Sequence, residues 1–402
     1  MEKNKKWNLR SQINNGLEIP REYYLNEGEK SMTKIIALYL PQFHPILEND
    51  KWYGKGFTEW TNVAKAKPLF KGHKQPRIPA DLGFYDLRVP EIRYQQAKMA
   101  KDYGIDAFAF YHYWFGNGKQ LLEKPFQEIL ADKKYTFPFM LHWANGSWYK
   151  KMWNAEGKGD KLLIEQTYPG KEDAVQHFYT LLPAFKDKRY IRIDGKIPFT
   201  IDQPMKSTEI INMMQLWREL AKKEGLEDFL FIAHSAHCEE VDALNRGGVN
   251  ALLGNEGIYQ GAYDAMIDSQ YRKIMYKNLA AKSKFVLRKK LGFPNVYRYE
   301  EAIKVALGEY DRDDRCFPEV FPRFDHSPRS KGKELIYIND TPELFEKYLY
   351  KTFEIIKNKP ESRKIVFIRA WNEWGEGNYL EPDLDSGLGY LEAIRKVKDA
   401  FK

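Results

Sequence analysis

The sequence predicts an α/β fold, a (β/α)₈ barrel whose long loop insertions gather at the C-terminal face. Short, almost continuous apolar runs recur about eight times along the chain, as expected of parallel strands that are covered on both faces. Segments with helical periodicity fill much of the space between these runs, and such alternation is typical of a parallel sheet. The length of 402 residues fits a barrel with insertions, for which about 200 to over 400 residues are usual.

The predicted strands are short apolar segments that follow a polar N-terminal region. They lie at 35–39, 106–111, 137–142, 197–202, 229–234, 251–254, 320–322 and 365–369. The apolar pattern is weakest at 320–322. Eight strands in about 370 residues favour a closed barrel over an open sheet.

Amphipathic segments between the strands predict the helices. Apolar residues follow Ile210 at three, four, seven, ten and eleven positions, and Gly225 provides a stop. Pro342, directly after Thr341, predicts the start of another helix. Further helices are expected at 92–103 and 388–401.

Composition and charge exclude several classes of protein. The chain has 64 Lys+Arg and 56 Asp+Glu, a net charge of +8, but the charge is spread out, so no nucleic-acid partner is expected. Cys238 and Cys316 stand alone, without zinc-binding or disulfide spacing, which fits a reducing compartment. The N-terminus lacks the apolar core of a secretory signal, and no apolar run approaches the ~18–20 residues of a membrane span. We therefore expect a soluble, cytoplasmic protein.

We interpret residues 1–32 as an N-terminal arm and 33–402 as one barrel domain with insertions at 40–89 and 255–316. Long loops in a compact domain are usually functional. The second insertion contains a run from Arg272 to Lys290 with eight Lys/Arg and no acid. A solvated helix face is the favoured interpretation, and peripheral contact with an anionic membrane or an acidic glycan is the alternative.

The densest polar cluster, IRAWNEWGEGNYLEPD at 368–383, follows the last predicted strand. Glu373 and Glu376 lie three positions apart, flanked by Trp371 and Trp374. Burial beside indole rings raises the pKa of a carboxyl group, and two neighbouring acids push their titrations apart. Such a pair can protonate a leaving glycosidic oxygen and supply a carboxylate for the opposite role. The alternative is that both are ordinary solvated loop acids; Glu381 and Asp383 are expected to be structural or rim residues.

Aromatic residues next to polar ones recur at the ends of other strands. Sugars present apolar C–H faces ringed by hydroxyls, so they suit flat rings with hydrogen-bonding partners close by. Any one of these side chains could instead belong to the packed core, but four such clusters at equivalent positions favour a site. The candidate substrate-binding residues are Tyr39, Gln42, His44, Trp60, Tyr111, Trp114, His142, Trp143, Asn145, His234, Asn372 and Trp374.

A competing hypothesis is a catalytic zinc held by His112, His142 and His234. The chain lacks H-x-H on the first strand and H-E-x-x-H anywhere, and the strand from 197 ends in Asp202 without a histidine. Histidines that bind a substrate hydroxyl are therefore favoured, and no metal is expected.

No other metal or cofactor is expected either. The D-x-D of Asp311 and Asp313 resembles a metal-binding pattern, but it follows a helical segment and is interpreted as a solvated helix end. No G-x-G-x-x-G or P-loop follows any strand, so no nucleotide cofactor is expected.

Several motifs resemble the WbsX-type family of polysaccharide-locus proteins: KIIALYLPQFHP, KWYGKGFTEWTNV, FYHYWF, LLEKP and AWNEWGEGNYLEPD. That family, often labelled glycosyltransferase, is similar to glycoside hydrolase family 99, the endo-α-mannosidases and endo-α-mannanases. The resemblance runs from about Met32 to the C-terminus. It implies a (β/α)₈ barrel, no metal and a retaining mechanism.

The resemblance also implies roles for the paired acids. Glu376 would be the general acid and then base, while Glu373 would assist the 2-hydroxyl of the substrate in attacking the anomeric carbon through an epoxide-like intermediate. Tyr39 would contact the sugar, and Asp325 and Arg329 match a motif of unclear role. Two residues depart from the patterns: Gly375 replaces the histidine of the hydrolase motif Asn-Glu-Trp-His-Glu-Gly, and Gly146 stands where WbsX-type sequences tend to have glutamate.

The sequence thus favours a retaining, metal-independent enzyme that cleaves an α-linked polysaccharide or oligosaccharide. Two alternatives stay open. The first is a glycosyltransferase or transglycosylase in capsule or O-antigen assembly, on a glycan that could be lipid-linked. The second is a non-catalytic carbohydrate-binding protein.

Overall fold

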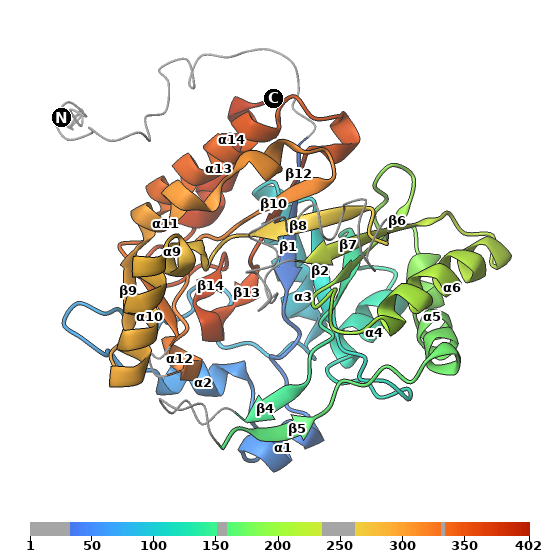
Figure 1. The fold of residues 1–402 in the computed structure, drawn as a ribbon, viewed down its shortest axis with the longest axis horizontal. Helices are drawn as coiled ribbons and strands as arrows, with labels where there is room; N and C mark the ends of the chain where they lie inside the picture. Colours follow the sequence, from blue (N-terminus) through green and yellow to red (C-terminus); the bar gives the residue numbers. More distant parts are fainter. Residues whose placement is uncertain (1–32, 151–158, 235–261, 331–333) are drawn as a thin grey trace.

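The computed structural model describes residues 33–150, 159–234, 262–330 and 334–402, and these form a closed barrel of eight parallel strands (Figure 1). Around the barrel each strand pairs with the barrel strands that precede and follow it in the sequence, and β12 closes the ring on β1. The barrel strands are β1 Lys34–Tyr39, β2 Ala107–His112, β3 Phe139–Trp143, β6 Ile197–Ile201, β7 Phe229–His234, β8 Ala265–Ser269, β10 Cys316–Val320 and β12 Ile365–Ile368. The predicted fold class is confirmed.

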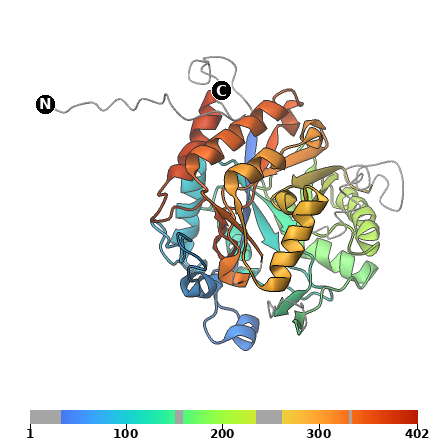
Figure 2. The ribbon, with the colours of Figure 1, turned by 60° about the vertical axis from the view of Figure 1, so that its left-hand side comes forward.

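Helices surround the barrel, as Figures 1 and 2 show from two directions. The longer ones are α3 Pro90–Asp102, α4 Lys124–Ala131, α5 Lys171–Phe185, α6 Glu209–Lys223, α10 Leu279–Leu291, α11 Tyr299–Ala306, α13 Pro342–Ile356 and α14 Gly389–Ala400. Two predicted boundary signals are confirmed. Gly225 has φ 69° just beyond α6, and the Thr341 hydroxyl accepts a hydrogen bond from the amide of Leu344 at the start of α13.

Shorter strands and helices lie outside the barrel sheet. Within the described residues, three two-stranded sheets pair β4 Trp148–Lys150 with β5 Lys161–Ile164, β9 Asn295–Arg298 with β11 Leu335–Ile338, and β13 Asn372–Glu373 with β14 Asn378–Tyr379. The short helices are α1 Leu47–Tyr53, α2 Glu59–Lys65, α9 Lys273–Tyr276, α12 Ser327–Ser330, η2 Glu309–Arg312, η3 Glu361–Arg363 and η4 Trp374–Glu376. In Figure 1, α1, α2, β4 and β5 lie together at the lower edge.

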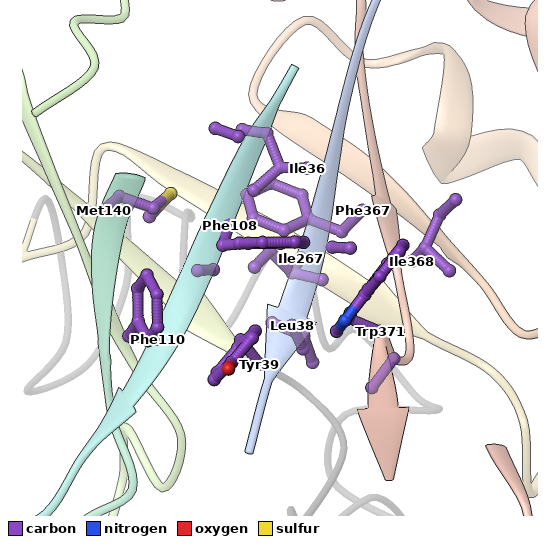
Figure 3. Close-up of a cluster of buried hydrophobic side chains, with 14 of the residues drawn as sticks. Ile36, Leu38, Tyr39, Phe108, Phe110, Met140, Ile267, Phe367, Ile368 and Trp371 are labelled. Carbon is purple, nitrogen blue, oxygen red and sulfur yellow. The ribbon is translucent and has the colours of Figure 1, made fainter. Parts of the chain in front are cut away.

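The barrel interior is filled by large apolar side chains from neighbouring strands, as in the close-up of Figure 3. The ring of Tyr39 lies 5.0 Å from that of Phe108 and 4.5 Å from that of Phe110, between centroids. Phe108 in turn contacts Trp371, at 5.2 Å. Because the strands are covered on both faces, their sequences are nearly continuous apolar runs.

Two strand predictions differ from the structure. The segment predicted at 251–254 lies outside the described residues, and the barrel strand found between β7 and β10 is β8, at Ala265–Ser269, inside the predicted insertion 255–316. The prediction at 320–322 was several residues late, because Pro318 and Glu319 interrupt the apolar pattern of β10. Glu319 is buried and ion-paired, which a search for apolar runs cannot detect.

The predicted N-terminal arm, 1–32, lies outside the described residues. The basic run forms α9 and α10, where Asn278 caps the N-terminus of α10 and Gly292 ends it in a left-handed conformation. Leu279, Val286 and Leu287 are exposed, in agreement with a largely solvated helix. Within the described parts of the chain, every helix is too short or too polar to cross a membrane.

Candidate active site

A cleft of about 780 Å³ opens at the C-terminal end of the barrel. Its walls come from loops that follow β1, β2, β3, β6, β10 and β12, as the barrel fold predicts. The lining residues are Leu40, Gln42, Tyr53, Phe57, Glu59, Asn62, Tyr111, Tyr113, Ala144, Ser147, Trp148, Tyr149, Lys150, Asp202, His326, Arg329, Arg369, Glu373 and Glu376.

The two predicted acids lie on one tight turn that rises from the end of β12. Asn372 anchors the turn to β1 because its side chain accepts a hydrogen bond from the Leu40 amide (2.7 Å) and donates one to the Leu40 carbonyl (3.0 Å). Gly377 closes the turn with φ 60°, where a Cβ would lie 2.8 Å from the backbone nitrogen of Asp325. Glycine is therefore required here both for conformation and for space. The turn presents Glu373 and Glu376 to the same cleft.

Arg329, from α12, binds both acids. Its Nη1 donates to Glu376 Oε1 at 2.6 Å and its Nη2 to Glu373 Oε1 at 2.8 Å. The same guanidinium forms a two-point ion pair with Glu59 of α2, through Nε and Nη2 at 2.9 Å each. One cation is thus shared among three carboxyl groups at the wall of the cleft.

Gly375 makes room for the Glu59–Arg329 pair. A Cβ at this position would lie 1.9 Å from Glu59 Oε1 and 2.8 Å from Arg329 Nε. Any side chain here would have to displace the pair. The departure from the hydrolase motif at Gly375 therefore has a steric explanation, since the space that a histidine would need is filled by a carboxylate.

The two acids are shifted in opposite directions. Burial, together with the nearby Glu376 and Glu59, outweighs Arg329 and raises the pKa of Glu373 to about 7. Burial acts in the same direction on Glu376, but Arg329, His326 and Arg369 outweigh it and hold the pKa of Glu376 well below its usual value. The pair therefore carries one titratable proton near neutral pH, with Glu373 as its preferred holder in this unliganded arrangement.

A chain of ionisable side chains continues below the cleft. Arg369 Nη1 lies 4.0 Å from Glu376 Oε2, while its Nε donates to Glu319 at 3.2 Å. Glu319 pairs with His234 Nε2 at 3.0 Å, and His234 Nδ1 pairs with Asp202 Oδ1 at 2.9 Å.

These contacts shift the pKa values in the chain. Burial alone would lower the pKa of His234, but the charges of Glu319 and Asp202 raise it above its usual value. The pKa of Glu319 is lowered to about 2 because Arg369 and His234 outweigh its burial.

The three-histidine set of the zinc hypothesis is not assembled. His112 is paired instead with His177, Nε2 to Nε2 at 2.8 Å. His142 and His234 do lie together, and Asp202 is the third group beside them. Asp202 ends the predicted strand from 197, whose lack of a histidine argues against a three-histidine site.

Four of the predicted site residues line the cleft: Gln42, Tyr111, Glu373 and Glu376. The others pack elsewhere. Tyr39, expected to contact sugar, is buried and donates its hydroxyl hydrogen to Gln96 at 2.7 Å. Asn372 holds the turn, and His142 and His234 lie buried behind Asp202.

Trp60 and Trp374, two of the candidate substrate-binding residues, lie buried behind the cleft wall. Trp374 stacks on Tyr379, with centroids 3.6 Å apart, and donates to Glu381. Trp60 packs against Trp374 and donates to the Tyr85 carbonyl. An aromatic residue at a strand end can point to either side of the loop layer, and sequence alone does not decide which.

The remaining candidates from the strand-end clusters make packing and hydrogen-bond contacts away from the cleft. Trp114 stacks on His177 and donates to Asp173. Trp143 lines a separate cavity of about 220 Å³ between α5 and α6. Asn145 ties its loop to Gln203 and Tyr168, and His44 Nδ1 pairs with the Pro41 carbonyl.

Sequence reasoning missed most of the cleft wall. The aromatic residues that do line it include Tyr53, Phe57, Tyr113, Trp148 and Tyr149. Tyr53 and Phe57 lie in the insertion 40–89, Tyr113 lies in the FYHYWF motif, and Trp148 and Tyr149 follow Gly146 in the loop after β3. Glu59, His326 and Arg369 could not be singled out from the sequence, because nothing marked them except their place in or next to the motifs that carry the family resemblance. At Gly146, a Cβ would lie 2.4 Å from Gln203 Nε2, so Gln203 takes the space of the glutamate that the resemblance expects.

Two further predictions are resolved away from the cleft. Asp311 is buried near Asp268 and Cys316, and burial raises its pKa to about 7, so the predicted solvated helix end was wrong for this residue. Glu381 is structural, as expected. It accepts hydrogen bonds from Tyr85, Gln96 and Trp374.

The described chain is thus a closed (β/α)₈ barrel with two neighbouring glutamates in a cleft at its C-terminal end. Residues 35–394 match the family described as glycosyltransferase WbsX, and the chain belongs to this family. The protein WxcX of Xanthomonas campestris pv. campestris, uncharacterised in strains B100 and ATCC 33913, is 35% identical over 370 residues. The match covers 90% of this chain and 49% of WxcX, so the chain spans about half the length of these curated relatives.

Solved structures show the same fold at low sequence identity. A glycoside hydrolase-like protein superposes with a TM-score of 0.52 at 13% identity, covering 92% of this chain and 94% of its own. The GH99 endo-α-mannosidase from Bacteroides thetaiotaomicron, in complex with bis-tris-propane, gives a TM-score of 0.52 at 14% identity, covering 92% and 97%.

Proposed function

We propose that this chain is a retaining enzyme that cleaves glycosidic bonds within an α-linked polysaccharide or oligosaccharide. The observation that carries the proposal is the pair Glu373 and Glu376, which share one turn, one cleft and one arginine while their pKa values are shifted apart. Glycosidic cleavage needs one carboxyl group that holds a proton and one that does not.

The resting electrostatics and the roles implied by the resemblance put the proton on different residues. Glu376, the acid by resemblance, is the one that Arg329 keeps ionised. We propose that an entering glycan displaces Arg329 from Glu376, which raises the pKa of Glu376 and lets the proton of Glu373 pass to it. Glu376 then protonates the leaving oxygen, and the Glu373 carboxylate accepts the proton of the 2-hydroxyl as that oxygen attacks the anomeric carbon.

The second half of the reaction reverses these transfers. Water attacks the anomeric carbon of the epoxide-like intermediate, Glu376 accepts the proton of that water, and Glu373 returns a proton to the 2-oxygen. Two displacements at one carbon retain its configuration. The two carboxyl groups make all the proton transfers, so this bond cleavage needs no metal ion.

The rest of the cleft supports a glycan as ligand. Tyr53, Phe57, Tyr111, Tyr113 and Trp148 give it aromatic surfaces that can stack on the C–H faces of sugar rings. Gln42, Asn62, Ser147 and Lys150 place hydrogen-bonding groups among them. The volume of about 780 Å³ suits more than a single sugar unit.

A second candidate function is transfer of a glycosyl unit to another glycan, which the family description, glycosyltransferase WbsX, favours. The same two acids would serve, with an acceptor hydroxyl in place of water in the second step. A lipid-linked donor or acceptor is compatible with this alternative.

The test compares wild type with Glu376→Gln on a panel of α-linked oligosaccharides, with and without added acceptor. Loss of the general acid should reduce turnover by about 10²–10⁴-fold while glycan binding survives. Glu381→Gln, which alters a buried acid outside the cleft, is the matched control and should keep turnover within a few-fold. Unchanged turnover in Glu376→Gln removes the proposed acid. If NMR shows a product of inverted anomeric configuration, the mechanism is not a retaining one. Binding without any product supports a carbohydrate-binding protein instead.

A further inference from the structure

We propose that His142, Asp202 and His234 form a binding site for a divalent transition-metal ion of the zinc class beneath the cleft. The three residues lie at the C-terminal ends of three consecutive barrel strands. His142 is in β3, Asp202 directly follows β6, and His234 ends β7, with β6 between the other two. The inference does not depend on the proposed function, which assigns these residues no role.

The ligand atoms have the spacing that a small metal ion needs. Asp202 Oδ1 lies 2.9 Å from His234 Nδ1 and 3.4 Å from His142 Nε2, and one ligand atom from each residue lies within 4.8 Å of the others. Zinc bonds of about 2.0–2.2 Å in a tetrahedral arrangement hold neighbouring ligand atoms roughly 3.3 Å apart. An ion can therefore enter with small side-chain movements.

A second layer of contacts orients His234 in the way usual for metal-binding histidines. Its other nitrogen, Nε2, pairs with Glu319 Oε1 at 3.0 Å, and Glu319 is held in turn by Ser269 and Arg369. A histidine whose free nitrogen contacts a fixed carboxylate has its ligating nitrogen aimed and made more basic. His112 and His177, the other buried histidine pair, lack such a carboxylate contact among the described residues.

Access and ligand chemistry indicate the type of ion. Both histidines are fully buried, whereas Asp202 lines the cleft together with Arg369 and Glu376. Three protein ligands with one open side are the pattern of a zinc site that can still bind a hydroxyl, carboxylate or water. Two imidazoles and one carboxylate suit zinc and its first-row neighbours, while calcium and magnesium prefer oxygen ligands alone.

A proton on His234, between Asp202 and Glu319, would satisfy the same contacts without a metal, so the experiment must separate these two states. The full chain is stripped with a chelator and titrated with ZnCl₂ by calorimetry. It is also titrated with CoCl₂, and the visible absorption of the bound cobalt is recorded. We expect one ion per chain and cobalt d–d bands typical of four- or five-fold nitrogen and oxygen coordination.

Three variants decide whether the ion is at this site. Asp202→Asn keeps the shape of the side chain and His142→Gln keeps its polarity; each should weaken zinc binding by at least about 100-fold, and Glu319→Gln by about 10–100-fold. His112→Gln is the matched control for loss of a buried histidine and should bind zinc like wild type. Near-UV circular dichroism confirms that each variant is folded. Wild type is also titrated with MgCl₂. Zinc affinity unchanged in Asp202→Asn and His142→Gln, no zinc uptake by wild type, or magnesium binding as tight as zinc would each overturn the proposal.

Discussion

Replacement of Gly375 by alanine tests whether the Glu59–Arg329 pair requires glycine in the turn that carries Glu373 and Glu376. The added Cβ would lie 1.9 Å from Glu59 Oε1 and 2.8 Å from Arg329 Nε, so one methyl group must push a buried two-point ion pair aside. Overpacking costs about 1–3 kcal/mol, and breaking a buried ion pair about 3–5 kcal/mol. Because the pair is displaced here and neither partner is removed, we expect the free energy of unfolding to fall by about 3 kcal/mol.

The measurement is urea unfolding followed by tryptophan fluorescence, with Gly146→Ala as the matched control. A Cβ at Gly146 would lie 2.4 Å from Gln203 Nε2, which is the end of a flexible, uncharged side chain. That side chain can rotate away, so its displacement should cost no more than about 1 kcal/mol. Equal stabilities of the two variants, or a Gly375→Ala protein as stable as wild type, would refute the argument that the carboxylate at Glu59 requires glycine at 375.

Four other outcomes follow from the contacts described above. In wild type, folding keeps a proton on Glu373 that the unfolded chain releases above pH ~4.5, because burial raises the pKa to about 7. This one group should therefore lower the free energy of unfolding by up to about 3 kcal/mol between pH 4.5 and 7. Asp311 and Glu381 are shifted in the same direction, so in urea titrations Glu373→Gln should remove only that share of the fall, and an unchanged pH dependence would contradict the shift. Glu376→Gln should reduce the opposite trend, a loss of wild-type stability as the pH drops below about 4.5, because the pKa of Glu376 is lowered; the remaining loss comes from other carboxyl groups with lowered pKa values, such as Glu319. Arg329→Met should cost about 3–5 kcal/mol at pH 8 and less at pH 5, where the carboxyl groups it leaves behind can protonate; a pH-independent cost would contradict the shared-cation arrangement. Tyr39→Phe removes the hydrogen bond to Gln96 and should lower the free energy of unfolding by about 1–2 kcal/mol. Glycan binding measured by calorimetry should stay unchanged; weaker binding would indicate that Tyr39 does contact the sugar.

Glu376 is held ionised in the unliganded structure, whereas the proposed mechanism needs it protonated. Arg329 is bound to three carboxyl groups at once, and in the proposed mechanism this contact keeps Glu376 ionised until a glycan displaces Arg329. A glycan that competes for Arg329 would therefore change both the geometry and the protonation of the pair. The pH dependence of turnover in Arg329→Lys, which keeps the charge but cannot make the two-point contact with Glu59, would reveal this coupling.

The strand pattern, the paired acids and the loop from 40 to 89 could be predicted from the sequence because each is a local property. Apolar runs such as 229–234 identify buried strands wherever they occur. Parallel strands place their C-terminal ends on one face, so a motif directly after β12 must lie at the barrel mouth. The same logic failed at β8 and β10, where Asp268 and Glu319 interrupt the apolar runs because they are buried in polar clusters that no single strand shows.

Only the tertiary structure decided which side chains reach the cleft. Trp60, Trp114 and Trp374 occur beside polar residues just as Trp148 does, yet the first three are buried in packing contacts and Trp148 lines the cleft. The ion pairing of Glu59 with Arg329 joins residues 270 positions apart, and the pairing of His142 with Asp202 and His234 joins three strands. Sequence patterns report the period and composition of a segment, whereas the direction of a loop side chain and the pKa of its acid depend on neighbours that only the closed barrel brings together.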